Sequence, residues 1–371
     1  MKNLVFLMMV IFAFTINVSA RQTKKKPLIQ LAILLDTSNS MDGLINQTKS
    51  ELWKIVNELA SSKRNGVTPD LEVALYEYGN DNLSKESGYI KKVTAFTNDL
   101  DAVSEALFSL KTRGGDEYCG EVIGAAVDNL KWHKSNKTLK LIFIAGNEAF
   151  TQGRVNYKNS CKRAIKNGIS VNTIFCGNYN QGVNTKWQDG ALLADGHYIN
   201  IDQNIKVVHI DAPQDKKIAE LGVKLNKTYI AYGRSGKKAM ARQRVQDSNA
   251  EKLSSNSMAQ RAMFKSKAQY RNDSWDLVDA SKNSKKSVAS MSKEELPDEM
   301  KDMSKKERVE YVEKKAKERK RIQKEIARLS KERAEYINKE RKKKAVNGKD
   351  TLDTAIIKAI HLLGKKKGFS F

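Results

Sequence analysis

One short stretch carries the residue types best suited to hold a cation. Residues 31–41 read LAILLDTSNSM, in which an apolar run ends at the carboxylate of Asp36 and the hydroxyls of Ser38 and Ser40 follow. A continuous apolar run bounded by polar residues is typical of a strand buried on both faces. A carboxylate at the end of such a strand lies where open α/β sheets bind ligands. One carboxylate and two hydroxyls are hard oxygen donors, which Mg²⁺ and Ca²⁺ prefer.

The same residues resemble a known motif. Asp36, Ser38 and Ser40 match the DxSxS signature of von Willebrand factor type A (vWA) domains. In that family the signature belongs to the metal-ion-dependent adhesion site, where the ion keeps an open position for a carboxylate of a partner protein. The alternative is a strand–helix turn in which the Asp and Ser side chains only cap the next helix.

The resemblance implies further ligands from later loops. Asp116 follows Gly114-Gly115 and precedes a helix, so it matches the later-loop position. The family's second aspartate, after the fourth core strand, is replaced by Gly146; Asn147 or Glu148 could supply an oxygen or hold a water. The resemblance therefore implies a weak Mg²⁺ or Ca²⁺ site formed by Asp36, Ser38, Ser40 and Asp116.

Strand and helix patterns alternate around this motif. Apolar or β-rich runs predict strands at 28–36, 71–78, 89–96, 139–145, 169–176 and 198–201. Apolar residues at helical spacing predict helices at 46–60, 99–110, 122–130 and 156–166. This alternation predicts an α/β fold with a doubly wound, mostly parallel sheet flanked by helices, as in vWA and Rossmann-like domains, over residues 26–205.

An α-helical extension is predicted to follow. Residues 206–290 contain helical patterns at 214–225 and 237–270, and an apolar patch at 275–280 that could dock on the α/β domain. Residues 347–371 are predicted to form a short helix and a basic tail.

Residues 291–346 are predicted to contain a long, highly charged basic helix. Its apolar residues approximate a coiled-coil seam, but Arg319 and Arg333 interrupt it. The pattern favours a single helix laced by i,i+4 ion pairs and packed on one side.

The N-terminus and the charge indicate where the protein acts. Residues 1–20 combine Lys2, an apolar core and Val-Ser-Ala, which predicts a secretory signal peptide cleaved near Ala20. No later stretch is long and apolar enough to span a membrane. The sequence therefore predicts a secreted or periplasmic protein. The formal net charge of +24 over 371 residues implies acidic partners, such as an envelope polymer or anionic lipid. Export makes nucleic acid an unlikely partner.

The three cysteines leave two possibilities open. Cys119, Cys161 and Cys176 could form one disulfide plus a buried thiol, with Cys119–Cys161 favoured and Cys119–Cys176 next. Alternatively, all three are small buried apolar residues.

These features favour a binding protein over an enzyme. The four histidines are scattered, and none has a nucleophile at a recognisable spacing. The main hypothesis is protein–protein interaction or adhesion at the cell envelope through the cation site. The alternative is a charge-driven binder of anionic polymers or lipids, with the α/β domain as scaffold. A metal-assisted hydrolase using Asp36 is a third hypothesis, but it lacks a general base.

Overall fold

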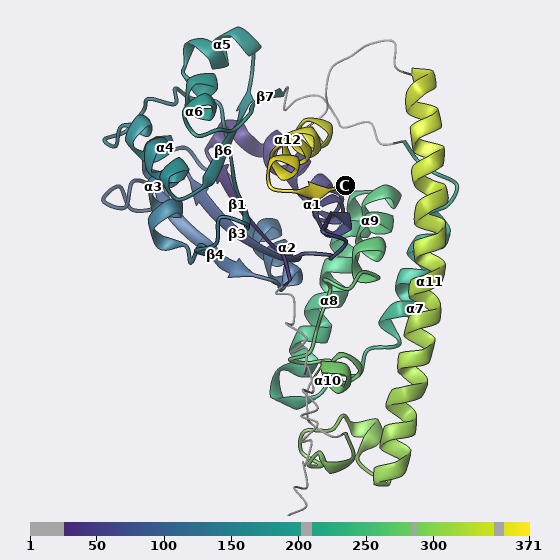
Figure 1. The fold of residues 1–371 in the computed structure, drawn as a ribbon. Helices are drawn as coiled ribbons and strands as arrows, with labels where there is room; N and C mark the ends of the chain where they lie inside the picture. Colours follow the sequence, from purple (N-terminus) through teal and green to yellow (C-terminus); the bar gives the residue numbers. More distant parts are fainter. Residues whose placement is uncertain (1–25, 202–209, 284–287, 345–351) are drawn as a thin grey trace, which may run out of the picture.

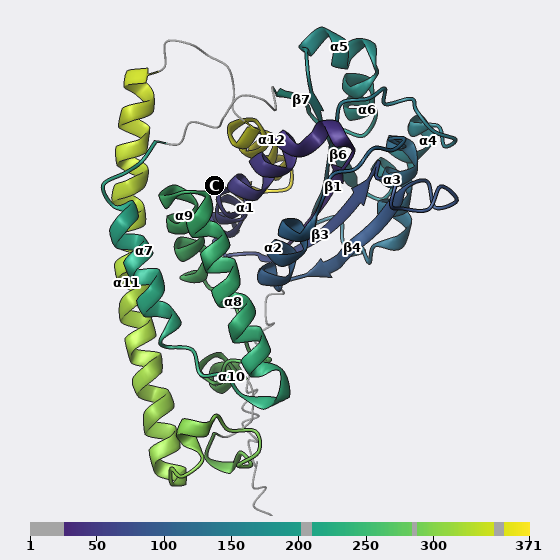
Figure 2. The same cartoon turned by 180° about the vertical axis from the view of Figure 1, so that it is seen from behind.

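The chain folds into an α/β domain joined to a long helical arm (Figures 1 and 2). The computed structural model describes residues 26–201, 210–283, 288–344 and 352–371. The predicted signal peptide, residues 1–20, lies outside the described residues. Among the described residues, no helix combines the length and apolar character needed to cross a bilayer.

A six-stranded sheet forms the centre of the α/β domain. Its strand order is β4-β3-β1-β5-β6-β7, and all neighbouring pairs are parallel except β3 and β4. The strands are β1 (Leu28–Asp36), β3 (Asp70–Tyr78), β4 (Ile90–Thr97), β5 (Leu139–Gly146), β6 (Ile169–Cys176) and β7 (Tyr198–Ile201). The central position of β1 explains its continuous apolar run, since both of its faces are covered. The predicted fold class is confirmed.

Helices from the same part of the chain cover one face of the sheet, here called the α3 face. Ala32 and Leu34 of β1 point to this side. The covering helices are α3 (Cys119–Asn129), α4 (Tyr157–Lys166), α5 (Tyr179–Asn184) and α6 (Trp187–Leu193). The sequence patterns had not indicated α5 and α6.

The opposite face, here called the α1 face, is covered by two helices from among the strands and by a third from the far end of the chain. Leu31 and Leu35 of β1 point to this side, toward α1 (Asp42–Ser61) and α2 (Leu100–Ser109). The C-terminal helix α12 (Leu352–Lys366) returns to pack beside α1 (Figure 1). The predicted basic tail then ends as a short strand, β8 (Phe369–Ser370), which pairs antiparallel with β2 (Lys63–Arg64).

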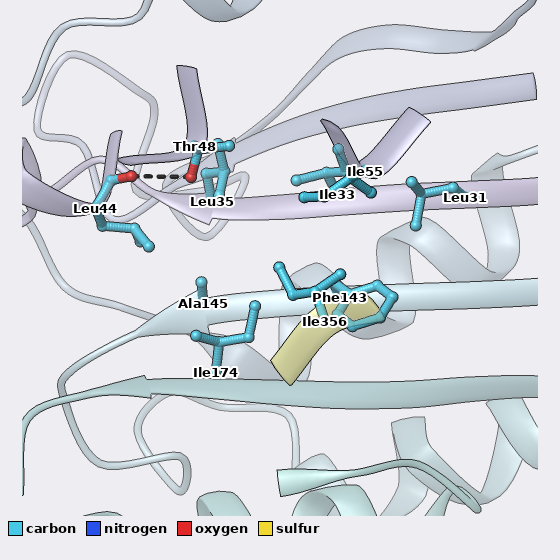
Figure 3. A pocket seen from close by; sticks show the side chains of 10 residues that line it. All are labelled: Leu31, Ile33, Leu35, Leu44, Thr48, Ile55, Phe143, Ala145, Ile174 and Ile356. Carbon is cyan, nitrogen blue, oxygen red and sulfur yellow. Dashed lines mark hydrogen bonds between the residues drawn. The ribbon is translucent and has the colours of Figure 1, made fainter. Parts of the chain in front are cut away.

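A small apolar cavity of about 40 Å³ lies between α1, α12 and the sheet (Figure 3). The Thr48 hydroxyl in its wall donates to Leu44 O at 2.9 Å, so this polar group is already satisfied. The cavity is lined by Leu31, Ile33, Leu35, Leu44, Thr48, Ile55, Phe143, Ala145, Ile174 and Ile356. A lining with so few polar groups offers a water little to bond.

The arm consists of α7 (Asp215–Asn226), α8 (Gly233–Leu253), α9 (Ser255–Lys265), α10 (Leu277–Asn283), two short 3-10 turns, η2 (Val288–Ser290) and η3 (Asp298–Met300), and α11 (Lys305–Lys344). The prediction of one helix over 237–270 was wrong. Ser254 is extended, with φ −175° and ψ 162°, and its side chain caps α9 by accepting from Ser257 N. A serine that bonds its own backbone in this way ends one helix and starts the next.

The 40-residue helix α11 is held on one side of the arm by apolar and charged contacts. Ile322 and Ile326 are buried in the core. The guanidinium of Arg319 contacts Asp276 at 2.6 Å and Asp279 at 3.0 Å, and that of Arg333 contacts Asp215 at 2.5 Å. The two arginines that interrupt the apolar seam of α11 therefore form the buried ion pairs between this helix and the rest of the arm. The 275–280 patch consequently binds α11 through Asp276.

The predicted disulfide is not formed, because all three cysteines are free and buried. Cys119 and Cys161 lie in the core on the α3 face, whereas Cys176 lies on the α1 face. The Cys161 thiol donates to Gly190 O at 3.4 Å, and burial raises its pKa to about 12. The alternative of three buried apolar residues is the correct one.

Candidate metal centre

Asp36 ends the central strand and is fully buried. Its Oδ1 atom accepts a hydrogen bond from Ser38 N at 2.7 Å. The Oδ2 atom is buried without a hydrogen-bond partner among the described residues. A buried carboxylate oxygen left without a donor is costly, so this atom requires a proton or a cation.

The two predicted serines lie beside this carboxylate. Ser38 Oγ and Ser40 Oγ are 3.3 Å apart, and Asn147 Nδ2 donates to Ser40 Oγ at 3.0 Å. Asn147 follows β5, the neighbour of β1, so the carboxyl ends of two parallel strands supply these groups. The structure therefore brings Asp36, Ser38, Ser40 and Asn147 together.

The acidic residue that faces Asp36 is Glu117. A Cβ atom at Gly79 would lie 2.8 Å from Asp36 Oδ1 and 3.0 Å from Glu117 Cγ, so both side chains pack against the same glycine. Glu117 is only 2% exposed, and its Oε2 accepts from Glu148 N at 3.3 Å. Asp116 is exposed instead, and its carboxylate accepts from the Tyr118 hydroxyl at 3.0 Å.

The two facing carboxyls have perturbed titration. Burial, together with the neighbouring Glu117 carboxyl, raises the pKa of Asp36 well above its usual range. Burial also raises the pKa of Glu117, and the neighbouring side chains of Asp36 and Ser38 oppose this rise. Two buried carboxyls in contact cannot both ionise without a compensating positive charge.

The shape of the site explains why Gly146 stands where the family has an aspartate. A Cβ atom there would lie 2.6 Å from the Tyr78 hydroxyl and 3.1 Å from the Trp187 ring. The Tyr78 hydroxyl is fixed by donating to Ala145 O at 2.9 Å, and the Trp187 ring by donating to Glu148 O at 2.7 Å. Any side chain at position 146 would displace these two groups, so the position does not accommodate an aspartate in this fold.

The donor set fits a hard divalent cation. It combines two carboxyls and two hydroxyls, all oxygen ligands of the type that Mg²⁺ and Ca²⁺ take. Among the described residues, no group of three or more His, Cys, Asp and Glu side chains is gathered for a metal. An ion here would therefore depend on the serine hydroxyls and on water for its remaining ligands.

The sequence prediction named Asp116, and the residue that lies beside Asp36 is its neighbour Glu117. Asp116 and Glu117 are adjacent, and both follow the glycine pair. Glu117 lies one residue before Tyr118, the N-cap of α3, and its backbone N–H donates to Gln152 Oε1 at 2.7 Å. Which of two neighbouring carboxylates turns inward is decided by that tertiary contact.

The strand order of the sheet, with polar side chains gathered at the carboxyl ends of β1 and β5, is that of a vWA-type fold. Residues 30–203 match the model of the von Willebrand factor type A domain family. No curated protein matches the chain.

Solved structures with similar folds include the SpRpn10 VWA domain, which is 17% identical, with a TM-score of 0.38, over 48% of this chain and 91% of that one. The conserved hypothetical protein BatB from Bacteroides thetaiotaomicron is 16% identical, with a TM-score of 0.36, over 47% of this chain and 90% of that one. Proximal thread matrix protein 1 from the mussel byssus is 10% identical, with a TM-score of 0.35, over 48% of this chain and 43% of that one. In that structure the MIDAS motif is occupied by zinc.

Proposed function

We propose that the α/β domain binds a divalent cation, Mg²⁺ or Ca²⁺, and through it a carboxylate of a partner protein. The observation that carries the proposal is the partnerless Oδ2 of fully buried Asp36, next to the Glu117 carboxyl. A cation would compensate the charge of both carboxyls, whose pKa values burial raises in its absence.

In this proposal Asp36, Ser38, Ser40 and Glu117 hold the ion, and Asn147 orients the Ser40 hydroxyl through its 3.0 Å hydrogen bond. A bound cation supplies a positively charged position at which a carboxylate can replace water. Ser40 is exposed, whereas Asp36 is buried, so a partner would approach from the side of the serine. Binding of this kind requires no chemical turnover, and we propose an interaction or adhesion role for the protein.

Calorimetric titration with Mg²⁺ and with Ca²⁺ tests the site. We expect Glu117→Gln to weaken binding by about tenfold or more, because it removes one of two ligand charges. Asp116→Asn is the matched control, since it removes the adjacent, exposed charge, and we expect affinity within about twofold of the original. Absence of heat at millimolar ion for the unaltered protein would refute the proposal, and equal losses in both variants would reject the role of Glu117.

The partner can then be sought by capture from a cell-envelope extract, with and without chelator. We propose a secreted or periplasmic location on the strength of the signal-peptide pattern in residues 1–20. Proteins retained only in the presence of the ion, and lost from an Asp36→Ala variant that remains folded, would support a carboxylate-binding function. Capture that is indifferent to chelator would contradict it.

A further inference from the structure

A row of basic side chains lies on the outward side of α11. We define this basic stripe as Lys314, Lys317, Lys320, Arg321 and Lys324, all of them exposed. Their spacing of three, six, seven and ten residues from the first member brings them near one side of the helix. Figures 1 and 2 show α11 as the outer edge of the arm in opposite views.

The stripe is not neutralised from within the part of the chain that the structure describes. The ion pairs formed there by α11 and its neighbours include none of the five members. Between residues 314 and 324 the single acidic residue is Glu318. Further along the helix, Arg328 pairs with Glu325 at 2.7 Å and with Glu332 at 2.5 Å. Among the described residues, α11 therefore has one segment with ion pairs on its outer side and one, the basic stripe, without them.

The opposite side of α11 holds the stripe in place. Arg319, in the middle of the stripe sequence, is 1% exposed and binds Asp276 and Asp279. Ile322 and Ile326 are buried on the same side. The five charges are therefore presented on a fixed helix, which reduces the conformational entropy lost on binding.

We propose that the basic stripe binds a linear anionic polysaccharide. A membrane surface is less suitable because an interfacial helix needs an apolar side, and four large apolar residues of α11, Val312, Ile322, Ile326 and Leu329, are buried in the arm. A folded protein partner is less suitable because lysine is depleted in protein interfaces, which need an apolar centre. Four of the five members are lysines, point charges that suit a hydrated polymer read by charge alone.

Single-stranded nucleic acid is disfavoured because the stripe contains no aromatic side chain on which bases could stack. The nearest aromatic, Tyr311, lies under Lys315 Nζ, 5.7 Å from the ring centroid. Duplex nucleic acid shares the charge of a polysaccharide, and the experiment below separates the two.

The test is fluorescence anisotropy with labelled polygalacturonate, using the full chain. We expect the triple variant Lys317→Gln, Lys320→Gln, Lys324→Gln to bind about tenfold more weakly and with a shallower salt dependence. The matched control is Lys158→Gln, Lys162→Gln, Lys166→Gln, which removes three exposed lysines from α4. We expect the control to retain affinity within about twofold. Glutamine preserves helix propensity, and circular dichroism verifies the fold.

Three outcomes would overturn the proposal. The first is no saturable binding of polygalacturonate by the unaltered protein, and the second is an equal loss in the α4 control. The third is tighter binding of duplex DNA, or of phosphatidylglycerol vesicles, than of the polysaccharide at the same salt concentration. The measurements are made in chelator, so that no cation is present to bind the carboxylates of polygalacturonate at the α/β domain, and they are then independent of the cation proposal.

Discussion

The two faces of the central sheet are covered in different ways. On the α3 face, the covering helices α3 to α6 all lie between β4 and β7 in the chain, and they pack mainly through apolar side chains. On the α1 face, α1 and α2 also contact α8 and α9 of the arm, and α12 arrives from the C-terminus. Arg261 of α9 lies in this second interface, where it binds Asp101 of α2 at 2.7 Å and Asp247 of α8 at 2.5 Å.

Buried ion pairs fix the position of the helices that are distant in the chain. A helix that lies between two strands of the same sheet in the chain is limited in where it can pack, so apolar packing is enough on the α3 face. A helix joined by a long detour has more alternatives, and buried ion pairs favour one of them because any other leaves charges unpaired. The arginine of this interface also lies over the Trp53 ring of α1, 4.6 Å from its centroid.

Removing the Arg261 guanidinium should produce the largest effect. Arg261→Met leaves Asp101 and Asp247 buried without this partner, and we expect a loss of about 3–5 kcal/mol in the free energy of unfolding. Chemical denaturation measures it. Arg242→Met is the control: Arg242 pairs with Asp99 in the same interface, but its side chain is 24% exposed, and we expect a loss below about 1 kcal/mol. Equal losses would contradict the account of the α1 face.

Shortening a buried side chain of α12 should have a smaller effect. Ile360 is fully buried, so we expect Ile360→Ala to lower the free energy of unfolding by about 2–4 kcal/mol through lost burial and a cavity. Leu362 is 44% exposed on the same helix, and Leu362→Ala should change it by less than about 0.5 kcal/mol. If the Ile360 variant is as stable as the control, α12 does not stabilise the domain.

The smallest effect concerns pH. Lys267 joins the arm to α1 by donating to Asn57 O at 2.9 Å and to Ser61, and burial lowers its pKa to about 8. The unfolded chain then binds the proton more tightly, so stability from this group rises as pH increases from about 8 to 10.5. We expect this rise to be absent from Lys267→Met. If thermal unfolding shows that the stability of the two proteins changes with pH in the same way, the prediction for Lys267 is wrong.

Local patterns predicted the sheet well. The predicted bounds of β1, β6 and β7 agree with the observed ones, because buried strands are short apolar runs bounded by polar residues. The position of α12 could not be predicted, since its partners lie in helices and strands from the other end of the chain. Arg319 and Arg333 were recognised as interruptions, but their role depends on Asp276 and Asp215, which no helical periodicity relates to them.

The part of the candidate site that lies in one turn could be predicted from the sequence, whereas the part that depends on tertiary contacts could not. Asp36, Ser38 and Ser40 lie in one turn after a strand, so their proximity follows from local sequence. Glu117 comes from another loop, and its inward direction depends on Gln152 and Gly79. The exclusion of a side chain at Gly146 depends on Tyr78 and Trp187, whose positions follow only from the folded sheet.

The return of α12 to the sheet means that the family boundary is not a folding boundary. The family match ends at residue 203, yet Ile356 and Phe369, far beyond it, belong to the core of the same domain. A fragment cut at that boundary would expose Leu31, Phe143 and Ile174 to water and would tend to aggregate. The core on the α1 face of the sheet therefore includes a helix that the chain reaches only after the whole arm.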